Sequence, residues 1–155
     1  LVILPFNTTL YPPLAKAFAE DVARGRAMLR DAMPGLVLFS LLPVIVTLCW
    51  SRQIVEIVLL RGRFSAENVE ITATILRTLI WSLPFVAIGR ALRYSLYSIG
   101  KYASASVAQG VTLASIALLA PMLIPAHGVL GLAMASMIAV SSQTLVMFLL
   151  LRLHT

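Results

Sequence analysis

The residues from 90 to 101 combine basic and aromatic side chains at a spacing suited to binding an anion. Five residues have this character: Arg90, Arg93, Tyr94, Tyr97 and Lys101. Steps of four, three and four residues place all but Arg93 on one helical face, with Arg93 beside it. Because guanidinium and ammonium groups pair with phosphate oxygens, one interpretation is contact with an anionic headgroup or phosphate. The competing interpretation is anchoring at the cytoplasmic interface, with long basic side chains reaching out of the bilayer and tyrosines in an aromatic belt.

Arg77 is a further basic residue in an otherwise apolar stretch. A charged side chain at the bilayer centre costs at least about 3 kcal/mol and usually faces a protein interior or an aqueous cavity. Glu70, Thr74 and Thr78 lie close to it in the sequence and are available to satisfy its donors. Two interpretations stay open: Arg77 belongs to a substrate path, or it is paired locally near the outer interface.

The sequence shows no set of residues suited to catalysis, a metal ion or an organic cofactor. Catalysis needs a nucleophile, a base and an orienting group together, whereas His127 stands alone in a turn and His154 lies near the C-terminal end. Cys49 is the single cysteine, which excludes a disulfide within the chain and a cysteine-rich metal site. No glycine-rich phosphate loop followed by Lys and Ser or Thr is present. We therefore expect no catalytic residue, no metal ligand and no cofactor.

Composition indicates that the bilayer, not water, is the main solvent of this chain. Hydrophobic residues make up 60% and charged residues 12%, with a mean hydropathy of +0.96, whereas ordinary globular domains are roughly half apolar and a quarter charged. A bilayer core admits helices or closed barrels, and the strict alternation of a barrel is missing. The formal charge of +6 comes from residues spread along the chain, so nucleic acid is not an expected partner.

The apolar runs predict an all-α fold, a polytopic transmembrane helical bundle with about four complete spans and an interfacial helix. Pro43 is expected to kink the first span. The second span is longer than a bilayer requires and contains Pro84 and three arginines, so it should be tilted, kinked or partly outside the hydrocarbon. The expected spans are 34–50, 71–99, 103–124 and 129–151, with the interfacial helix at 51–60.

The chain is expected to divide into three parts. Residues 1–13 have the pattern of the end of a preceding transmembrane helix, closed by Pro12 and Pro13, which predicts that the chain is a fragment. Residues 14–32 predict a cytoplasmic amphipathic segment, and residues 33–155 hold the four spans. Since basic residues mark cytoplasmic ends, we assign two groups: Lys16, Arg24, Arg26, Arg30, Arg90, Arg93, Lys101 and Arg152 to the cytoplasmic side, and Arg52, Arg61 and Arg63 to the other.

Two polar or small-residue patterns concern how the last two spans pack. A small-residue face on the last span, from Gly128 and Gly131 to Ala135 and beyond, predicts close approach of another helix. On the third span, the stripe beginning with Gln109 and Thr112 is interpreted as interhelical hydrogen bonding or as the lining of a cavity. Carboxylates are missing from the apolar spans, so any acid that couples transport to an ion is expected outside this chain.

A series of short motifs runs through the chain. They are Leu10-Tyr11-Pro12-Pro13-Leu14-Ala15, Leu42-Pro43, Ile54-Val55-Glu56-Ile57-Val58-Leu59-Leu60-Arg61-Gly62-Arg63-Phe64, Leu83-Pro84-Phe85, Leu96-Tyr97-Ser98 and Gly128-x-x-Gly131-Leu132-Ala133. The Arg-Gly-x-Phe element is the most specific. In these motifs and their order, the chain resembles the MurJ/MviN-type lipid II flippase family, within the oligosaccharidyl-lipid and multidrug exporter superfamily. The resemblance covers nearly the whole chain and corresponds to most of the C-terminal lobe.

The resemblance implies two pseudo-symmetric lobes that rock about a central cavity. It implies a non-enzymatic, multi-pass transporter of the bacterial inner membrane, which flips a polyprenyl-diphosphate-linked saccharide such as the peptidoglycan precursor lipid II. Its partners would be that substrate, the bilayer and the N-terminal lobe of the same chain. Where the family usually has an Asp and then Thr-Pro, this chain has Gly100-Lys101-Tyr102-Ala103. The alternative is therefore a related polysaccharide-lipid or multidrug exporter.

Overall fold

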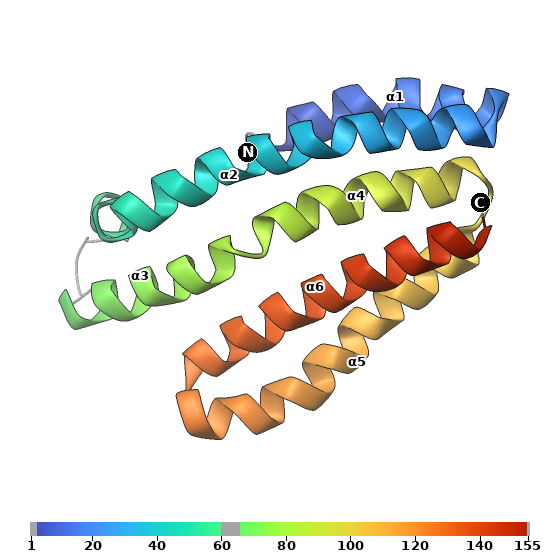
Figure 1. The fold of residues 1–155 in the computed structure, drawn as a ribbon. Helices are drawn as coiled ribbons and strands as arrows, with labels where there is room; N and C mark the ends of the chain where they lie inside the picture. The colour runs from blue at the N-terminus through green and yellow to red at the C-terminus, as the bar shows by residue number, and fades with distance from the viewer. Residues whose placement is uncertain (1–2, 60–65, 155) are drawn as a thin grey trace.

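The computed structural model describes residues 3–59 and 66–154, and its regular structure there is entirely helical (Figure 1). Three helices are long and apolar enough to cross a membrane, and a fourth candidate span is a bent pair of helices. The predicted all-α polytopic fold is therefore confirmed, while the Arg-Gly-x-Phe element with Arg61 and Arg63 lies outside the described residues. The helices are α1 (Ile3–Glu20), α2 (Val22–Leu59), α3 (Ala66–Ile80), α4 (Leu83–Ser98), α5 (Tyr102–His127) and α6 (Val129–His154).

The helices run back and forth across the molecule in three layers: α1 with α2, α3 followed by α4, and α5 with α6 (Figure 1). The α1–α2 connection, the α4–α5 connection and the end of α6 lie at one end, and the α5–α6 turn lies at the other. This alternation agrees with the assignment of Lys16, Arg24 and Lys101 to one side of the membrane.

Helix α4 is the centre of the bundle, because it packs against α1, α2, α5 and α6. Its residues Ala91, Leu92 and Leu96 are buried in a cluster that takes side chains from every one of these neighbours. Lipid tails are as apolar as leucine, so the closeness of this packing holds the helices together in a bilayer. The other buried members of the cluster are Leu14, Phe18, Leu29, Leu36, Ala105, Ala108, Met147 and Leu151.

The first two helices form a hairpin, and here two expectations are wrong. Helix α1 does not end at Pro12 and Pro13 but continues to Glu20, because the turns after the prolines pack into the core. The segment 14–32 is not one amphipathic helix: the chain breaks at Asp21, whose Oδ1 accepts a hydrogen bond of 3.0 Å from the Ala23 N–H. This side-chain cap ends the first helix and begins α2, which then continues across residue 33 without a boundary.

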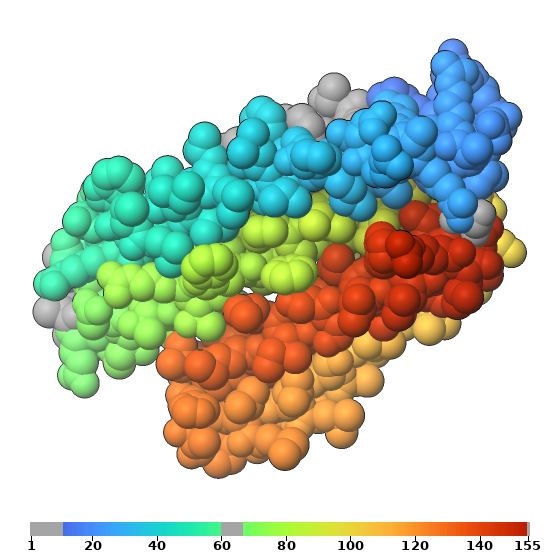
Figure 2. All heavy atoms as spheres, viewed as in Figure 1, coloured from blue at the N-terminus to red at the C-terminus, as the bar shows by residue number. Residues whose placement is uncertain are grey.

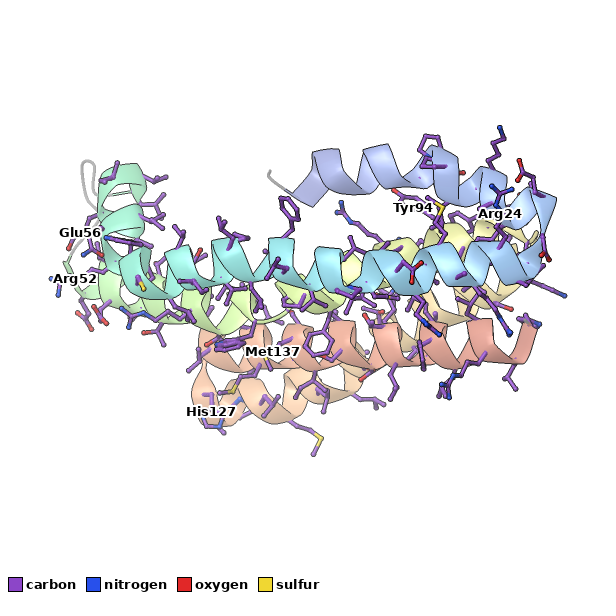
Figure 3. All side chains as sticks on the ribbon, turned by 45° about the horizontal axis from the view of Figure 1, so that its top comes forward. Arg24, Arg52, Glu56, Tyr94, His127 and Met137 are labelled. Carbon is purple, nitrogen blue, oxygen red and sulfur yellow. The ribbon has the colours of Figure 1, made fainter. Side chains whose placement is uncertain are left out.

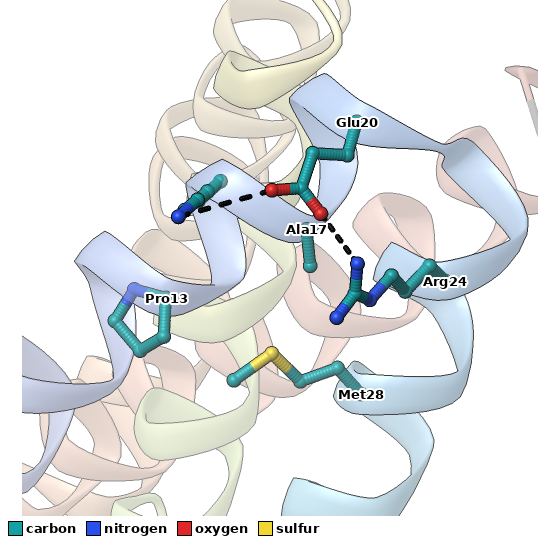
Figure 4. A pocket seen from close by; sticks show the side chains of 6 residues that line it. Pro13, Ala17, Glu20, Arg24 and Met28 are labelled. Carbon is teal, nitrogen blue, oxygen red and sulfur yellow. Dashed lines mark hydrogen bonds and ion pairs between the residues drawn. The ribbon is translucent and has the colours of Figure 1, made fainter.

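Charged side chains close this turn on its outer face. The Glu20 carboxylate accepts a 2.6 Å hydrogen bond from Arg24 and lies 3.9 Å from the Lys16 ammonium (Figure 4). All three side chains are well exposed, so each pair contributes little stability, typically below about 1 kcal/mol. Both pairs share one carboxylate, that of Glu20.

Helix α2 changes direction at Trp50, the residue with non-helical angles, at φ −120° and ψ 18°. The kink expected at Pro43 stays a prediction. After Trp50, the buried Val55 packs against Val69 and Ala73 of α3, and this contact directs the last two turns away from the axis of α2. Figure 3 shows Arg52 and Glu56 in this terminal segment, paired at 2.9 Å. It is the short amphipathic helix that the sequence predicted after the first span.

The long second span is broken, as its length and proline predicted. Helices α3 and α4 meet at an angle of 41° over the break between Ile80 and Leu83. Ser82 donates its hydroxyl to the Leu79 carbonyl at 2.7 Å. Pro84 falls in the first turn of α4, where a helix does not need its N–H.

Helices α5 and α6 form the tightest pair, joined by a single turn residue, Gly128, at φ +58°. The buried Gly131, Ala135 and Ala139 confirm the packing role of the small-residue face. A Cβ at Gly131 would overlap the Leu123 carbonyl oxygen of α5. Backbone atoms cannot move aside as a flexible side chain can.

Replacing this glycine tests the packing. Gly131→Ala is expected to destabilise the full-length protein by about 1–3 kcal/mol through overpacking. Gly110→Ala, in α5 with nothing within 4 Å of the new Cβ, should be neutral or stabilise by up to about 1 kcal/mol because alanine favours helix. Thermal unfolding of both purified variants in detergent measures the difference, and equal midpoints would contradict the α5–α6 contact.

Candidate functional site

A polar cavity of about 290 Å³ lies between α4, α5 and α6, and two of the predicted site residues line it. They are Arg90 and Arg93, one turn apart on α4. The remaining lining residues are Phe85, Val86, Gly89, Gln109, Thr112, Val140, Gln143 and Thr144. None of the lining residues is acidic, so the cavity has a net positive charge.

Hydrogen bonds join the three helices around this cavity. The Gln109 Oε1 atom accepts from the Arg93 Nη2 at 3.0 Å and from the Gln143 Nε2 at 2.8 Å. The Thr144 hydroxyl lies 3.0 Å from the carbonyl oxygens of Phe85 and Val140. The amide of Gln109 therefore fixes Arg93 in place and links α5 to α6.

Arg90 is the residue of this group whose donors are available. Within the described ranges 3–59 and 66–154, Arg90 has no hydrogen bond or ion pair, although it is partly buried against the cavity. An arginine stays protonated and presents five N–H donors. The cavity therefore offers one fixed and one unpaired guanidinium, an arrangement suited to a ligand with two neighbouring negative groups.

The remaining residues of the predicted stripe do not join this cavity. Tyr94 turns to α1, where its ring centroid lies 4.5 Å from that of Tyr11 (Figure 3). Tyr97 pairs with Tyr102 at 5.5 Å, at the start of α5. Lys101 is exposed in the α4–α5 connection. The residues of the predicted stripe thus face three different neighbours, α1, α5 and α6, because α4 is surrounded by helices on several sides.

Arg77 lies apart from the cavity and has partners of its own. Its Nε donates a 2.5 Å hydrogen bond to the buried Ser51 hydroxyl, directly after the α2 bend, and its Nη1 lies 3.9 Å from Glu70. Of the local partners named from the sequence, Glu70 is present, whereas Thr74 and Thr78 donate their hydroxyls to carbonyls of their own helix. In this structure Arg77 ties α3 to the α2 bend.

The sequence reasoning missed Gln143 and Thr144 as cavity residues. Both are polar side chains inside an apolar span, and both are less than a tenth exposed. Buried polar groups in a membrane span face partners or cavities. The occurrence of these two polar residues inside an apolar span could therefore have predicted that they face a cavity. Gln109 and Thr112 satisfy both interpretations of the third-span stripe, since they line the cavity and Gln109 also bonds to another helix.

The chain is similar to known proteins over most of its length. The family model "Lipid II flippase MurJ" matches residues 1–154. A protein of Bdellovibrio bacteriovorus named "Probable lipid II flippase MurJ" is 32% identical over 105 residues, which are 68% of this chain and 20% of that protein. A solved structure, "Lipid II flippase MurJ, inward closed conformation", has a TM-score of 0.86 at 22% identity and covers 98% of this chain and 32% of its own. The chain thus spans a fifth to a third of the length of these relatives, and the solved structure supports the fold.

The amide bridge at Gln109 yields a stability test. Gln109→Leu removes the acceptor shared by Arg93 and Gln143 and is expected to cost about 1–3 kcal/mol, because two donors lose their partner. Gln109→Glu keeps an oxygen acceptor for Arg93 and should retain more stability. Thermal unfolding in detergent measures both, with Ser106→Ala as control, since that hydroxyl bonds only to its own helix. A Gln109→Leu midpoint equal to the control would refute the bridge.

The Arg77–Ser51 contact yields a double-mutant cycle. Arg77→Ala and Ser51→Ala should each destabilise the protein, and the double variant should lose about 1 kcal/mol less than the sum because both changes remove one contact. Pairing Arg77→Ala with Thr78→Ala serves as the control, since Thr78 bonds only within its helix, and should be additive. Additivity in both cycles, measured by thermal unfolding, would show that the contact contributes nothing.

Proposed function

Because this chain belongs to the lipid II flippase MurJ family, whose model matches residues 1–154, we propose that the protein flips lipid II across the bacterial inner membrane. The resemblance read from the sequence motifs is thereby confirmed. The chain is multi-pass, as its spans predicted, and belongs to the inner membrane, as the resemblance implied. Its transport activity and its substrate, a polyprenyl-diphosphate-linked saccharide, are our proposals, since the chain spans only part of its relatives.

The observation that supports a substrate role most directly is the unpaired Arg90 beside Arg93 in a cavity without carboxylates. We propose that these guanidinium groups neutralise part of the diphosphate while the saccharide passes. Arginine suits this ligand because its planar fork pairs with phosphate oxygens through two bonds. Charged side chains inside a membrane are costly and usually serve a substrate or ion path.

We further propose that the protein acts without breaking a covalent bond. Flipping requires only that a polar headgroup cross the bilayer inside a protein cavity, first open to one side and then to the other. The N-terminal lobe would supply the opposite wall of the main cavity. Tyr94, Tyr97 and Arg77 are proposed to position helices near this path, since each contacts a neighbouring helix. The exposed Lys101 is proposed to anchor the α4–α5 connection at the membrane interface.

Complementation tests this function. The full-length gene is placed in a bacterium depleted of its own lipid II flippase, and growth and lipid II accumulation are followed. The unaltered protein should rescue growth. Arg90→Gln should reduce transport at least about tenfold at equal protein level, since a charged hydrogen bond is worth about 1.5–3 kcal/mol. Lys16→Gln, an exposed cation outside the cavity, is the matched control and should rescue fully.

The outcomes separate the two parts of the proposal. Full rescue by Arg90→Gln would contradict the role of the polar cavity between α4, α5 and α6. It would not contradict lipid II as the substrate. Failure of the unaltered protein to rescue, despite stable membrane insertion, would contradict lipid II as the substrate and favour a flippase for another polyprenyl-linked glycan.

A further inference from the structure

A second cluster of arginines lies in a groove between α2 and α6, on a side of α4 next to the polar cavity. Arg26 and Arg30 come from the first turns of α2, and Arg152 comes from the last turn of α6. Both helices pack on α4, and a band of α4 atoms is visible between them (Figure 2). The groove has a volume of about 460 Å³, and its other lining residues are Leu29, Met33, Leu92, Phe148 and Leu151.

This cluster has no acidic partner. No carboxylate lines the groove, and over the described ranges neither Arg26 nor Arg30 has a hydrogen bond or ion pair. The guanidinium of Arg152 lies 4.9 Å from the centroid of the Phe148 ring, a cation–π contact that leaves its charge uncompensated. Arginine does not release its proton to relieve repulsion. Three positive charges are thus gathered where an anion would be attracted.

The groove continues from the arginines toward the middle of the bilayer. An adjoining apolar hollow of about 330 Å³ shares Met33, Leu92 and Phe148 and extends to Ile88 and Leu145. Along α6 it reaches back to Ser141, and eleven residues at a helical rise of 1.5 Å span roughly 16 Å. That length is close to half of the roughly 30 Å hydrocarbon core, so the groove runs from headgroup level through one leaflet.

We propose that this groove binds an anionic glycerophospholipid of the cytoplasmic leaflet. Its phosphodiester lies among Arg26, Arg30 and Arg152, and one acyl chain follows the apolar hollow toward Leu145. Charge and length both select this occupant: the positive end lies at headgroup level, and the remainder is apolar over one leaflet. Basic pockets between transmembrane helices on the cytoplasmic side are suited to anionic lipid headgroups.

The bound lipid would join two helices that the protein itself barely connects. Helices α2 and α6 each contact α4, and the lipid fills the space between them. The two sites use different arginines, since Arg26, Arg30 and Arg152 line the groove while Arg90 and Arg93 line the polar cavity, although the apolar hollow shares Phe85 and Thr144 with that cavity. The inference therefore does not depend on the transported substrate.

Native mass spectrometry of the full-length protein tests the proposal, with phosphatidylglycerol as the probe and phosphatidylethanolamine as the zwitterionic comparison. Phosphatidylglycerol should bind more tightly. Arg30→Gln combined with Arg152→Gln should weaken its binding roughly ten- to thirtyfold, given the attraction of each basic residue for anionic lipid. The control combines Lys16→Gln with Arg24→Gln, which removes the same charge from the same end of the bundle, and should stay within about twofold of the unaltered protein.

Two results would overturn the proposal: no preference for phosphatidylglycerol, or equal loss of binding in both double variants. A second measurement locates the lipid. In a protein whose other cysteines, including Cys49, are replaced, Leu145→Cys should react with a lipid-soluble maleimide, and added phosphatidylglycerol should slow this reaction. Protection of Leu145→Cys even without added lipid would show that another segment of the full chain covers the groove, which would also contradict the proposal.

Discussion

Hydrocarbon offers no hydrogen-bond partner, and this constraint decides the arrangement around α4. The helix carries two arginines through the bundle, so its polar side must face other protein groups rather than lipid tails. Gln109 of α5 supplies such a group to Arg93, and Gln143 of α6 donates in turn to Gln109. The opposite side, with Leu92, is free to be apolar and packs toward α2. The polar cavity and the arginine-lined groove thus lie on two different sides of α4.

Tertiary contacts hold the bend of α2 at Trp50, whereas a proline, Pro84, stands directly after the break between α3 and α4. Pro12 and Pro13 lie inside a helix that continues past them, and the altered angles of α2 are at Trp50 rather than Pro43. At the α2 bend, the Arg77–Ser51 bond and the packing of Val55 on α3 hold the chain in its new direction. A proline removes one backbone bond, and neighbours that bury the next turn compensate for that loss.

Sequence alone predicted much of the fold, because apolar length is a strong signal in a bilayer. The predicted bounds of the spans over α5 and α6 agree with the structure within a few residues, and the length of the second span correctly predicted a break. The hairpin at Asp21 was missed, since a cap by one carboxylate looks like any charged position on an amphipathic segment. For the site, the helical stripe from Arg90 grouped residues by their own helix. The neighbour that each stripe residue contacts depends on the packing of α1, α5 and α6. No local sequence pattern predicts that packing.

The single-residue turn at Gly128 has a mechanical consequence for the cavity. With so short a connection and close backbone contact at Gly131, α5 and α6 are expected to move together as one rigid pair. The Gln109–Gln143 bond lies within that pair, whereas the Arg93–Gln109 bond crosses to α4. Any motion that widens the cavity by separating α4 from the pair must stretch the second bond and spare the first. Opening would therefore release Arg93, so that the polar cavity presents two unpaired guanidinium groups instead of one when it is widest.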